Sequence, residues 1–447
     1  MVIRYLLLGV FALMAMVTLA HASLIPWRFV YGKRWHPIPF KMAFPALAAM
    51  MTVMAMGSAL GAAAVFVGSG ALPAGRAVAV GVAAAGLVAA GAHLLYIRRT
   101  AAGHRGFERA FGPNWQDKLP ATPGMLQRRW ALWPFPVGSA RVQRDVAIWT
   151  LPDGRSLLAD LWQPAQGAPP SGVAFLFFHG SAWHFSDKGV GTDPMFGHLA
   201  AQGHVVLDVA YRLAPETDLF GMVADVKRAV AWVRGNARQL GIDPERIVVG
   251  GASAGGHISL LAAYGGEHPA FCPPDLMGVR TDVAGVVSLY GPCDLREYLG
   301  HHAGRLSITG KPATEKAPLR LDAMSGEQMM MNLLGGMAED VPEQFDLAAA
   351  TTHIRAGGPP ALIVQGEADF ITPADATRRM VEQLRQAQIP VVYLEFPWTE
   401  HAWDIGTAMA NMVFGRRLYP KFLDSQYAPP STATLYDLER FLALLAA

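Results

Sequence analysis

Residues 247–255 read IVVGGASAG, an apolar strand that runs into a tight turn, and the helix-like run 257–263 follows at once. A turn this sharp needs small residues on both sides of the serine at its apex. The pattern therefore predicts a strand–turn–helix unit that exposes the hydroxyl of Ser253 as a nucleophile. The amide of Ala254 would then point at the carbonyl under attack.

The chain from residue 141 onward supplies a sheet for this unit. Short apolar runs alternate with helical patterns, which is typical of a mostly parallel sheet covered by helices on both faces. The first two strands flank Pro152-Asp153-Gly154, a hairpin signal. We predict an α/β fold with eight strands, at 145–150, 156–163, 173–178, 205–209, 247–250, 283–289, 361–365 and 391–396, and with helices that include 221–237, 257–264 and 375–388.

One segment, about 292–358, interrupts this alternation. It is polar over 305–320 and carries the cluster Met329-Met330-Met331. We interpret it as a cap-like insertion over the carboxyl edge of the sheet. Its methionines either adapt to varied apolar partners or pack the insertion against the sheet.

The first 97 residues have the composition of a membrane region. The chain of 447 residues is 52% hydrophobic and only 16% charged, and the apolar excess lies here. Three stretches without Asp, Glu, Lys or Arg each exceed the roughly 20 residues that a helix needs to cross the hydrocarbon core. They predict transmembrane helices at 5–27, 42–72 and 77–97, and the last two form a hairpin rich in Gly and Ala.

Loop charges favour a cytoplasmic location for the large domain. Basic residues concentrate in 28–41 and 98–129, which share one side of the membrane if there are three spans, and this bias marks the cytoplasmic side. We therefore expect an integral protein of a bacterial inner membrane with its large domain in the cytoplasm. The alternative is a signal peptide that ends at Ala20-His21-Ala22, which would place that domain in the periplasm.

A basic connector, residues 98–140, joins the membrane region to the domain at 141–447. It contains Trp115, Trp130 and Trp133, and it either lies along the membrane surface or acts as a plain linker. The net charge of +2 gives no footprint for a nucleic acid. Cys272 and Cys293 form neither a disulfide framework nor a metal-ligand pattern, so we expect no metal site.

Two loops downstream of Ser253 carry candidate partners for it. A serine hydroxyl needs a base to take its proton, and the base needs an orienting carboxylate. In an open α/β sheet such groups lie in loops at the carboxyl ends of strands. Asp369 follows the strand 361–365, and His401 follows the strand 391–396. We predict the triad Ser253, Asp369 and His401, with Glu367 and Asp404 as rival orienters of the histidine.

The loop after strand 173–178 supplies candidate donors for an oxyanion. Its sequence is His179-Gly180-Ser181-Ala182-Trp183. We predict that the amides of Ser181 and Ala182 join that of Ala254 in an oxyanion hole. His179 and Gly180 would support this loop, the histidine by hydrogen bonding. Trp183 would either wall an acyl pocket or belong to the core.

The block from Arg141 to the C-terminus resembles α/β-hydrolases of the hormone-sensitive-lipase and bacterial carboxylesterase type. The matching motifs are His179 to Trp183, Tyr211-Arg212-Leu213-Ala214-Pro215-Glu216, Asp243-Pro244-Glu245-Arg246-Ile247, Gly251 to Gly256, Gly366 to Asp369, and Glu400-His401-Ala402. The resemblance implies an α/β-hydrolase fold, the same triad and oxyanion amides, and catalysis without a metal or nucleotide cofactor. Ser181 departs from the family, which has a glycine there, and a conformation that only glycine adopts cheaply would strain or rearrange the loop.

These features predict a membrane-anchored serine hydrolase that cleaves a carboxylic ester through an acyl-enzyme intermediate. Its partners would be a small-molecule ester and the lipid bilayer, and the location suggests a lipophilic substrate. The same triad also suits an amidase or formamidase. A hydrolase fold without activity, serving as a membrane scaffold, is the alternative from a different class, and the change at Ser181 keeps it open.

Overall fold

The computed structural model describes residues 2–31, 48–67, 73–122, 124–130, 139–180, 182–266, 268–302, 307–308, 324–369, 371–404 and 429–446. The chain forms two compact units. The first comprises residues 1–103, 128–135 and 396–434, and the second comprises 104–127, 136–395 and 435–447. The described residues 396–404 and 429–434 thus fall in the same unit as the N-terminal helices.

Three long helices are the main elements of the first unit. They are α1 (Val2–Tyr31), α3 (Ala48–Val67) and α4 (Pro73–Thr100), and each is long and apolar enough to cross a membrane, as predicted. Small residues let α3 and α4 approach closely, since a β-carbon at Gly86 would lie 2.6 Å from the hydroxyl of Ser58 and 2.8 Å from the carbonyl oxygen of Ala55. His21 Nδ1 of α1 lies 2.9 Å from His93 Nε2 of α4, a buried polar contact between these two helices.

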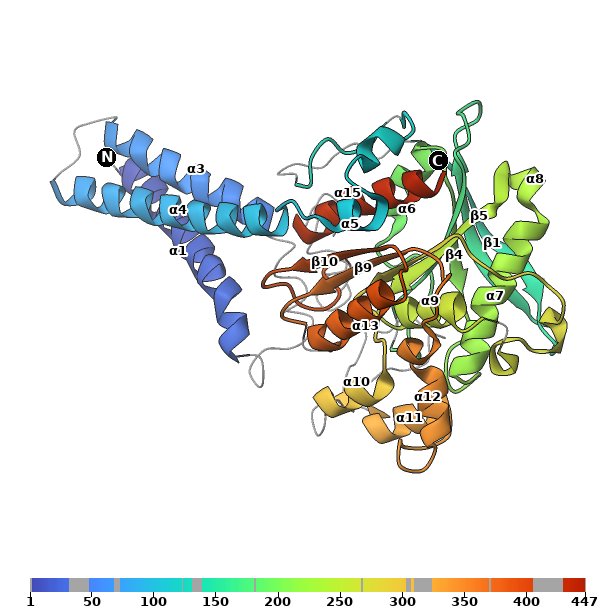
Figure 1. The fold of residues 1–447 in the computed structure, drawn as a ribbon. Coiled ribbons are helices and arrows are strands. Elements are labelled where there is room, and N and C mark those ends of the chain that lie inside the picture. Colours follow the sequence, from blue (N-terminus) through green and yellow to red (C-terminus); the bar gives the residue numbers. More distant parts are fainter. Residues whose placement is uncertain are drawn as a thin grey trace. The chain divides into compact units, whose positions relative to one another are not determined.

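An eight-stranded sheet forms the centre of the second unit (Figure 1). Its order is β1-β2-β4-β3-β5-β6-β9-β10. The pairs β1–β2 and β2–β4 are antiparallel, whereas β4–β3, β3–β5, β5–β6 and β6–β9 are parallel. The strands are β1 (Ala140–Thr150), β2 (Ser156–Pro164), β3 (Gly172–Phe178), β4 (Val205–Ala210), β5 (Ile242–Ala252), β6 (Gly285–Leu289), β9 (Ala361–Gly366) and β10 (Val391–Phe396). This confirms the predicted α/β-hydrolase fold.

Helices cover both faces of this sheet (Figure 1). One face carries α6 (Asp193–Ala201) and α15 (Pro429–Ala446), and the other carries α7 (Leu219–Gly235), α9 (Ala254–Tyr264) and α13 (Ala374–Gln386). Strands β3 and β4 and residues 247–252 of β5 are almost fully buried, which explains why they are apolar apart from Asp208. Because β3, β5, β6 and β9 are parallel neighbours, the loops that follow them gather at one edge of the sheet.

The described part of the insertion contains three short helices: α10 (Leu295–His302), α11 (Gly326–Leu334) and α12 (Pro342–Ala348). The two-residue strands β7 (Ser307–Ile308) and β8 (Met324–Ser325) pair beside them. Met329 and Met330 are buried in the main hydrophobic core, whereas Met331 is 48% exposed. Two of the three methionines therefore pack the insertion against the body of the unit, and one faces outward.

The connector packs on the last helix of the chain. It contains α5 (Gly106–Phe111) and the 3-10 helix η1 (Trp115–Lys118). The ring of Phe111 lies 6.2 Å from that of Phe441 on α15, and the amide of Leu126 donates to the buried carboxylate of Glu439 at 2.8 Å. Residues 104–127 are therefore a packed part of the second unit.

A buried carboxyl group lies in the middle of β4. Asp208 is fully buried, and its Oδ2 accepts the amide of Gly189 at 2.7 Å. Across the sheet it pairs in register with Asp160, which binds Arg144 at 2.6 Å and Lys188 at 3.1 Å. Arg144 and Lys188 thus form ion pairs with Asp160. Burial raises the pKa of Asp208 to about 7.

This raised pKa predicts a specific pH dependence of stability. The folded chain holds a proton on Asp208 that the unfolded chain releases near pH 4, so this group stabilises the fold fully below that pH and its contribution is lost as the pH rises through 7. Asp208→Asn removes the titration and keeps an oxygen for Gly189. Between pH 5 and 8 the free energy of unfolding of the variant should rise by on the order of 2–3 kcal/mol relative to wild type. Denaturant unfolding in detergent at several pH values measures this, and parallel pH profiles would contradict it.

Candidate active site

Ser253 lies at the turn between β5 and α9 with a backbone conformation that side-chain-bearing residues rarely adopt. Its φ is 51° and its ψ is −119°. The amide of Ser253 donates to the carbonyl of Leu289 at 2.8 Å, and its own carbonyl accepts from the amide of His257 at 3.0 Å. A strained residue at a strand-to-helix turn is the backbone feature of a nucleophile elbow.

Two glycines make this turn possible. A β-carbon at Gly251 or at Gly255 would collide with the carbonyl oxygen of Phe178, the last residue of β3. Both positions therefore require glycine, because the backbone of β3 passes directly against the turn. The small residues that the sequence places around Ser253 are needed for close backbone packing as well as for the bend.

The loop after β3 lies beside the serine. A β-carbon at Gly180 would lie 3.3 Å from the β-carbon of Ser253 and 3.1 Å from the carbonyl oxygen of Ala252. Ala182 and Trp183 follow with φ values of 46° and 62°, so the chain here takes consecutive left-handed conformations. Ser181 lies outside the described residues. The structure thus brings the predicted oxyanion loop into van der Waals range of the predicted nucleophile.

A ring stack and two hydrogen bonds hold the two ends of this loop. The buried ring of His179 stacks on Tyr211 with ring centroids 4.6 Å apart, and the Tyr211 hydroxyl donates to the His179 carbonyl at 3.0 Å. Burial lowers the pKa of His179 to about 4, so the ring is neutral at physiological pH. At the other end, the amide of Ala214 donates to the carbonyl of Trp183 at 2.9 Å. Residues 211–214 therefore form hydrogen bonds with the first and last residues of the loop, His179 and Trp183.

Trp183 is buried, and two groups that the sequence did not single out pack against it. Its ring meets those of His257 on α9 and Tyr298 on α10 edge-on, each at 5.6 Å. His257 Nε2 donates to the carbonyl of Ala348 at 2.8 Å, and burial lowers the pKa of this histidine to about 4. These contacts link the loop to the insertion, so Trp183 is as much a part of the core as a wall of any pocket.

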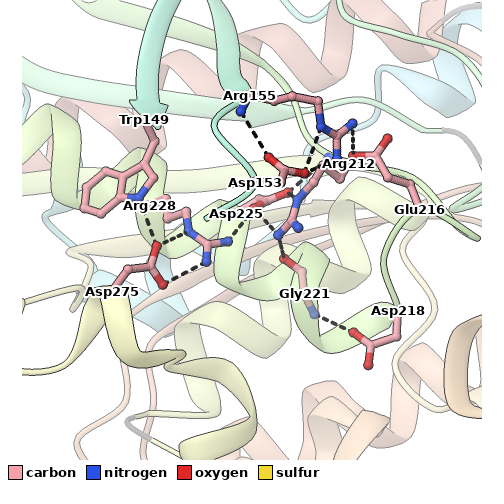
Figure 2. A network of polar contacts seen from close by, with 10 residues as sticks. All are labelled: Trp149, Asp153, Arg155, Arg212, Glu216, Asp218, Gly221, Asp225, Arg228 and Asp275. Carbon is pink, nitrogen blue, oxygen red and sulfur yellow. Dashed lines mark hydrogen bonds and ion pairs between the residues drawn. The ribbon is translucent and has the colours of Figure 1, made fainter. Parts of the chain in front are cut away.

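Segment 211–214 is itself held by a charge network that Figure 2 shows. Arg212 makes two hydrogen bonds to the fully buried Asp225 on α7, at 2.9 and 2.8 Å, and Arg228 binds the same carboxylate at 2.7 Å. Arg228 also binds both oxygens of Asp275, at 2.8 and 2.9 Å. The buried negative charge of Asp225 is thus shared by two guanidinium groups, as a buried ion requires.

Asp369 lies in the loop after β9 and is fixed by its own neighbours. Its Oδ1 accepts the amides of Ile371 and Thr372, both at 2.8 Å. Its Oδ2 accepts the Thr372 hydroxyl at 2.7 Å and the side-chain amide of Gln365 at 3.0 Å. This buried, well-oriented carboxylate contrasts with its rival Glu367 in the same loop, which is half-buried.

His401 follows β10 in a segment of the first unit, whereas Ser253 and Asp369 belong to the second. The histidine is buried, at 3% exposed, and its other rival orienter, Asp404, is half-buried. Within the described part of the chain, no cluster of three or more His, Cys, Asp or Glu side chains could hold a metal ion.

The network in Figure 2 allows a matched test of its buried and exposed pairs. Arg212→Met leaves the buried Asp225 with one guanidinium fewer and should lower the free energy of unfolding by about 3 kcal/mol. Arg155→Met removes an equal charge, but Arg155 is 56% exposed beside partners that are 47% and 40% exposed. It should cost less than about 1 kcal/mol. Denaturant unfolding compares the two, and equal losses would rule out the special role of Asp225.

Comparisons with known proteins relate this chain to one family and to several esterases. The BD-FAE family model matches residues 159–384. The probable carboxylic ester hydrolase LipM of Mycobacterium tuberculosis is 33% identical over 311 residues, which are 66% of each chain. The esterase LipC of the same organism is 29% identical over 57% of this chain and 58% of LipC. The chain thus spans about two thirds or less of these two relatives. Apo esterase 2 of Thermogutta terrifontis matches 64% of this chain and 99% of its own at 23% identity, with a TM-score of 0.45.

Proposed function

Because the chain belongs to the BD-FAE family of α/β-hydrolases, we propose that it is a membrane-anchored serine esterase with the triad Ser253, Asp369 and His401. The observation that carries this proposal is the left-handed Ser253 at the β5–α9 turn with Gly180 in van der Waals contact range. A scaffold that performs no chemistry would have no need of this strained serine beside a left-handed loop. The esterase names of the mycobacterial relatives support the same reaction class.

The reaction proceeds in two acyl-transfer steps. His401 takes the proton of the Ser253 hydroxyl as its oxygen attacks the ester carbonyl, and Asp369 orients the imidazole and stabilises its charged form. The imidazolium then gives the proton to the leaving alcohol as the ester bond breaks. Water, activated by the same histidine, hydrolyses the acyl-enzyme and restores the serine.

The tetrahedral intermediates carry an oxyanion that needs preorganised donors. We assign the amides of Ala254, Ser181 and Ala182 to this role. The left-handed φ of Ala182 and the grip of residues 211–214 on the loop support this assignment, because donors must be fixed before the charge develops. Trp183 would border the acyl side of the site.

The three apolar helices suggest the class of substrate and the location. A helix bundle long enough to span the bilayer would keep the hydrolase domain beside the membrane, where lipophilic esters concentrate. We therefore propose a lipophilic carboxylic ester as the substrate and a cytoplasmic position for the domain.

Labelling by a fluorophosphonate probe tests the catalytic proposal on the detergent-solubilised full chain. Wild type and Ser156→Ala, which alters an exposed serine at the start of β2, should both label. Ser253→Ala should not label, and its ester hydrolysis should fall at least about 10⁴-fold. Asp369→Asn and His401→Ala should lose about 10³- to 10⁴-fold in kcat. Folded wild type that neither labels nor hydrolyses esters would favour the scaffold, and faster cleavage of the matched amide would favour an amidase.

Reporter fusions after Ala447 test the orientation. If the domain is cytoplasmic, a fusion to green fluorescent protein should fluoresce. A fusion to alkaline phosphatase should be inactive, because the phosphatase needs the periplasm to form its disulfides. An active phosphatase with a dark fluorescent fusion would place the domain outside the cytoplasm and would overturn the assignment.

A further inference from the structure

The turn that carries His401 lies against the ends of two membrane helices. We call residues 397–404 the histidine loop. Trp398 of this loop packs on a small apolar cluster of Ala48, the first residue of α3, and Tyr96, near the end of α4, which are 0% and 1% exposed. The guanidinium carbon of Arg99 lies 4.3 Å from the centroid of the Trp398 ring. An apolar contact and a cation–π contact therefore join the histidine loop to the bundle.

A second tryptophan fixes the other side of the histidine loop. Trp403 is fully buried, and its ring packs edge-on against Phe396 at 5.5 Å. Its Nε1 donates to the Thr434 hydroxyl at 3.3 Å, and the Ser431 hydroxyl donates to its carbonyl at 3.4 Å. His401 thus lies between two anchored tryptophans, one held by the start of α15 and one held by the membrane helices.

The backbone of the histidine loop depends on these outside contacts. Trp398 and Ala402 have φ values of 55° and 54°, left-handed conformations that are costly for residues with a side chain. Residues 397–404 form turns, and within them the Thr399 hydroxyl donates to the Pro397 carbonyl at 3.1 Å. Such conformations persist when the surrounding structure imposes them. Loss of the contacts at Trp398 should therefore let the loop relax and carry His401 with it.

We propose that Arg99 and Trp398 are positioning residues for His401, so that the ends of the membrane helices set the geometry of the catalytic base. The inference rests on the proposed function, because it concerns the histidine that takes the serine proton. Proton transfer needs the imidazole within hydrogen-bond reach, and a displacement of about 1 Å costs on the order of 100-fold in rate. Substrate binding does not depend on this proton transfer, so the loss should appear in kcat rather than in KM.

The experiment uses the full chain in lipid nanodiscs with p-nitrophenyl butyrate as the substrate. Arg99→Ala and Trp398→Ala should lower kcat about 10- to 100-fold with KM changed less than about twofold. Arg99→Lys and Trp398→Phe, which keep a cation and an aromatic ring, should recover most of the loss. Arg98→Ala is the matched control, since it removes the same charge from the neighbouring position of α4.

Hydrogen–deuterium exchange of peptides that cover 397–404 gives a readout that is independent of turnover. Arg99→Ala should speed exchange there, and Arg98→Ala should not. If Trp398→Ala does not fold, the comparison of Arg99→Ala with Arg98→Ala still tests whether the helix end positions His401. Equal kcat and equal exchange for Arg99→Ala and Arg98→Ala in an active enzyme would overturn the inference alone. A wild type that neither labels at Ser253 nor hydrolyses the ester would overturn the proposed function and the inference with it.

Discussion

The close approach of β3 to the β5–α9 turn is the constraint on which the rest of the site depends. Because the Phe178 carbonyl leaves no room for a β-carbon at Gly251 or Gly255, the turn can bend sharply enough to hold Ser253 at a φ of 51°. The same approach carries the loop that follows β3 directly to the serine, with Gly180 at its side. One packing contact therefore both shapes the turn that carries the proposed nucleophile and brings the proposed oxyanion donors beside it.

The buried ion pairs of Asp225 stabilise the segment that supports this loop. The loop at 179–183 has left-handed residues that would relax if it stood alone, and segment 211–214 holds both of its ends. That segment is held in turn by Arg212 on the buried Asp225, whose charge would be very costly without its two guanidinium partners. The ion pairs of Figure 2 thus act indirectly on the proposed oxyanion loop, by fixing the segment that supports it.

Much of the fold follows from local sequence, because strand alternation and the small residues around Ser253 are local signals. All eight strands lie where apolar runs predict them, and the first hairpin follows from Pro152-Asp153-Gly154. Long-range packing is what the pattern could not contain. Nothing near Arg212 in the sequence identifies Asp225 as its partner. The sequence also does not distinguish Asp208 from any other strand residue, although burial raises its pKa to about 7. The union of 396–404 and 429–434 with the first helices depends on contacts between residues some 300 positions apart, which no local pattern encodes.

The three proposed catalytic residues differ in what fixes them. Ser253 is set by the tightly packed β5–α9 turn and its backbone hydrogen bonds, and Asp369 is set by four hydrogen bonds from its own strand and loop. His401 lies in a turn with left-handed residues at Trp398 and Ala402, and Trp398 contacts residues of α3 and α4. A base needs finer placement than a binding group, since proton transfer fails over about an ångström. Our proposal therefore gives the residue with the strictest geometric demand a support that comes from α3 and α4, and it makes these two helices determinants of turnover.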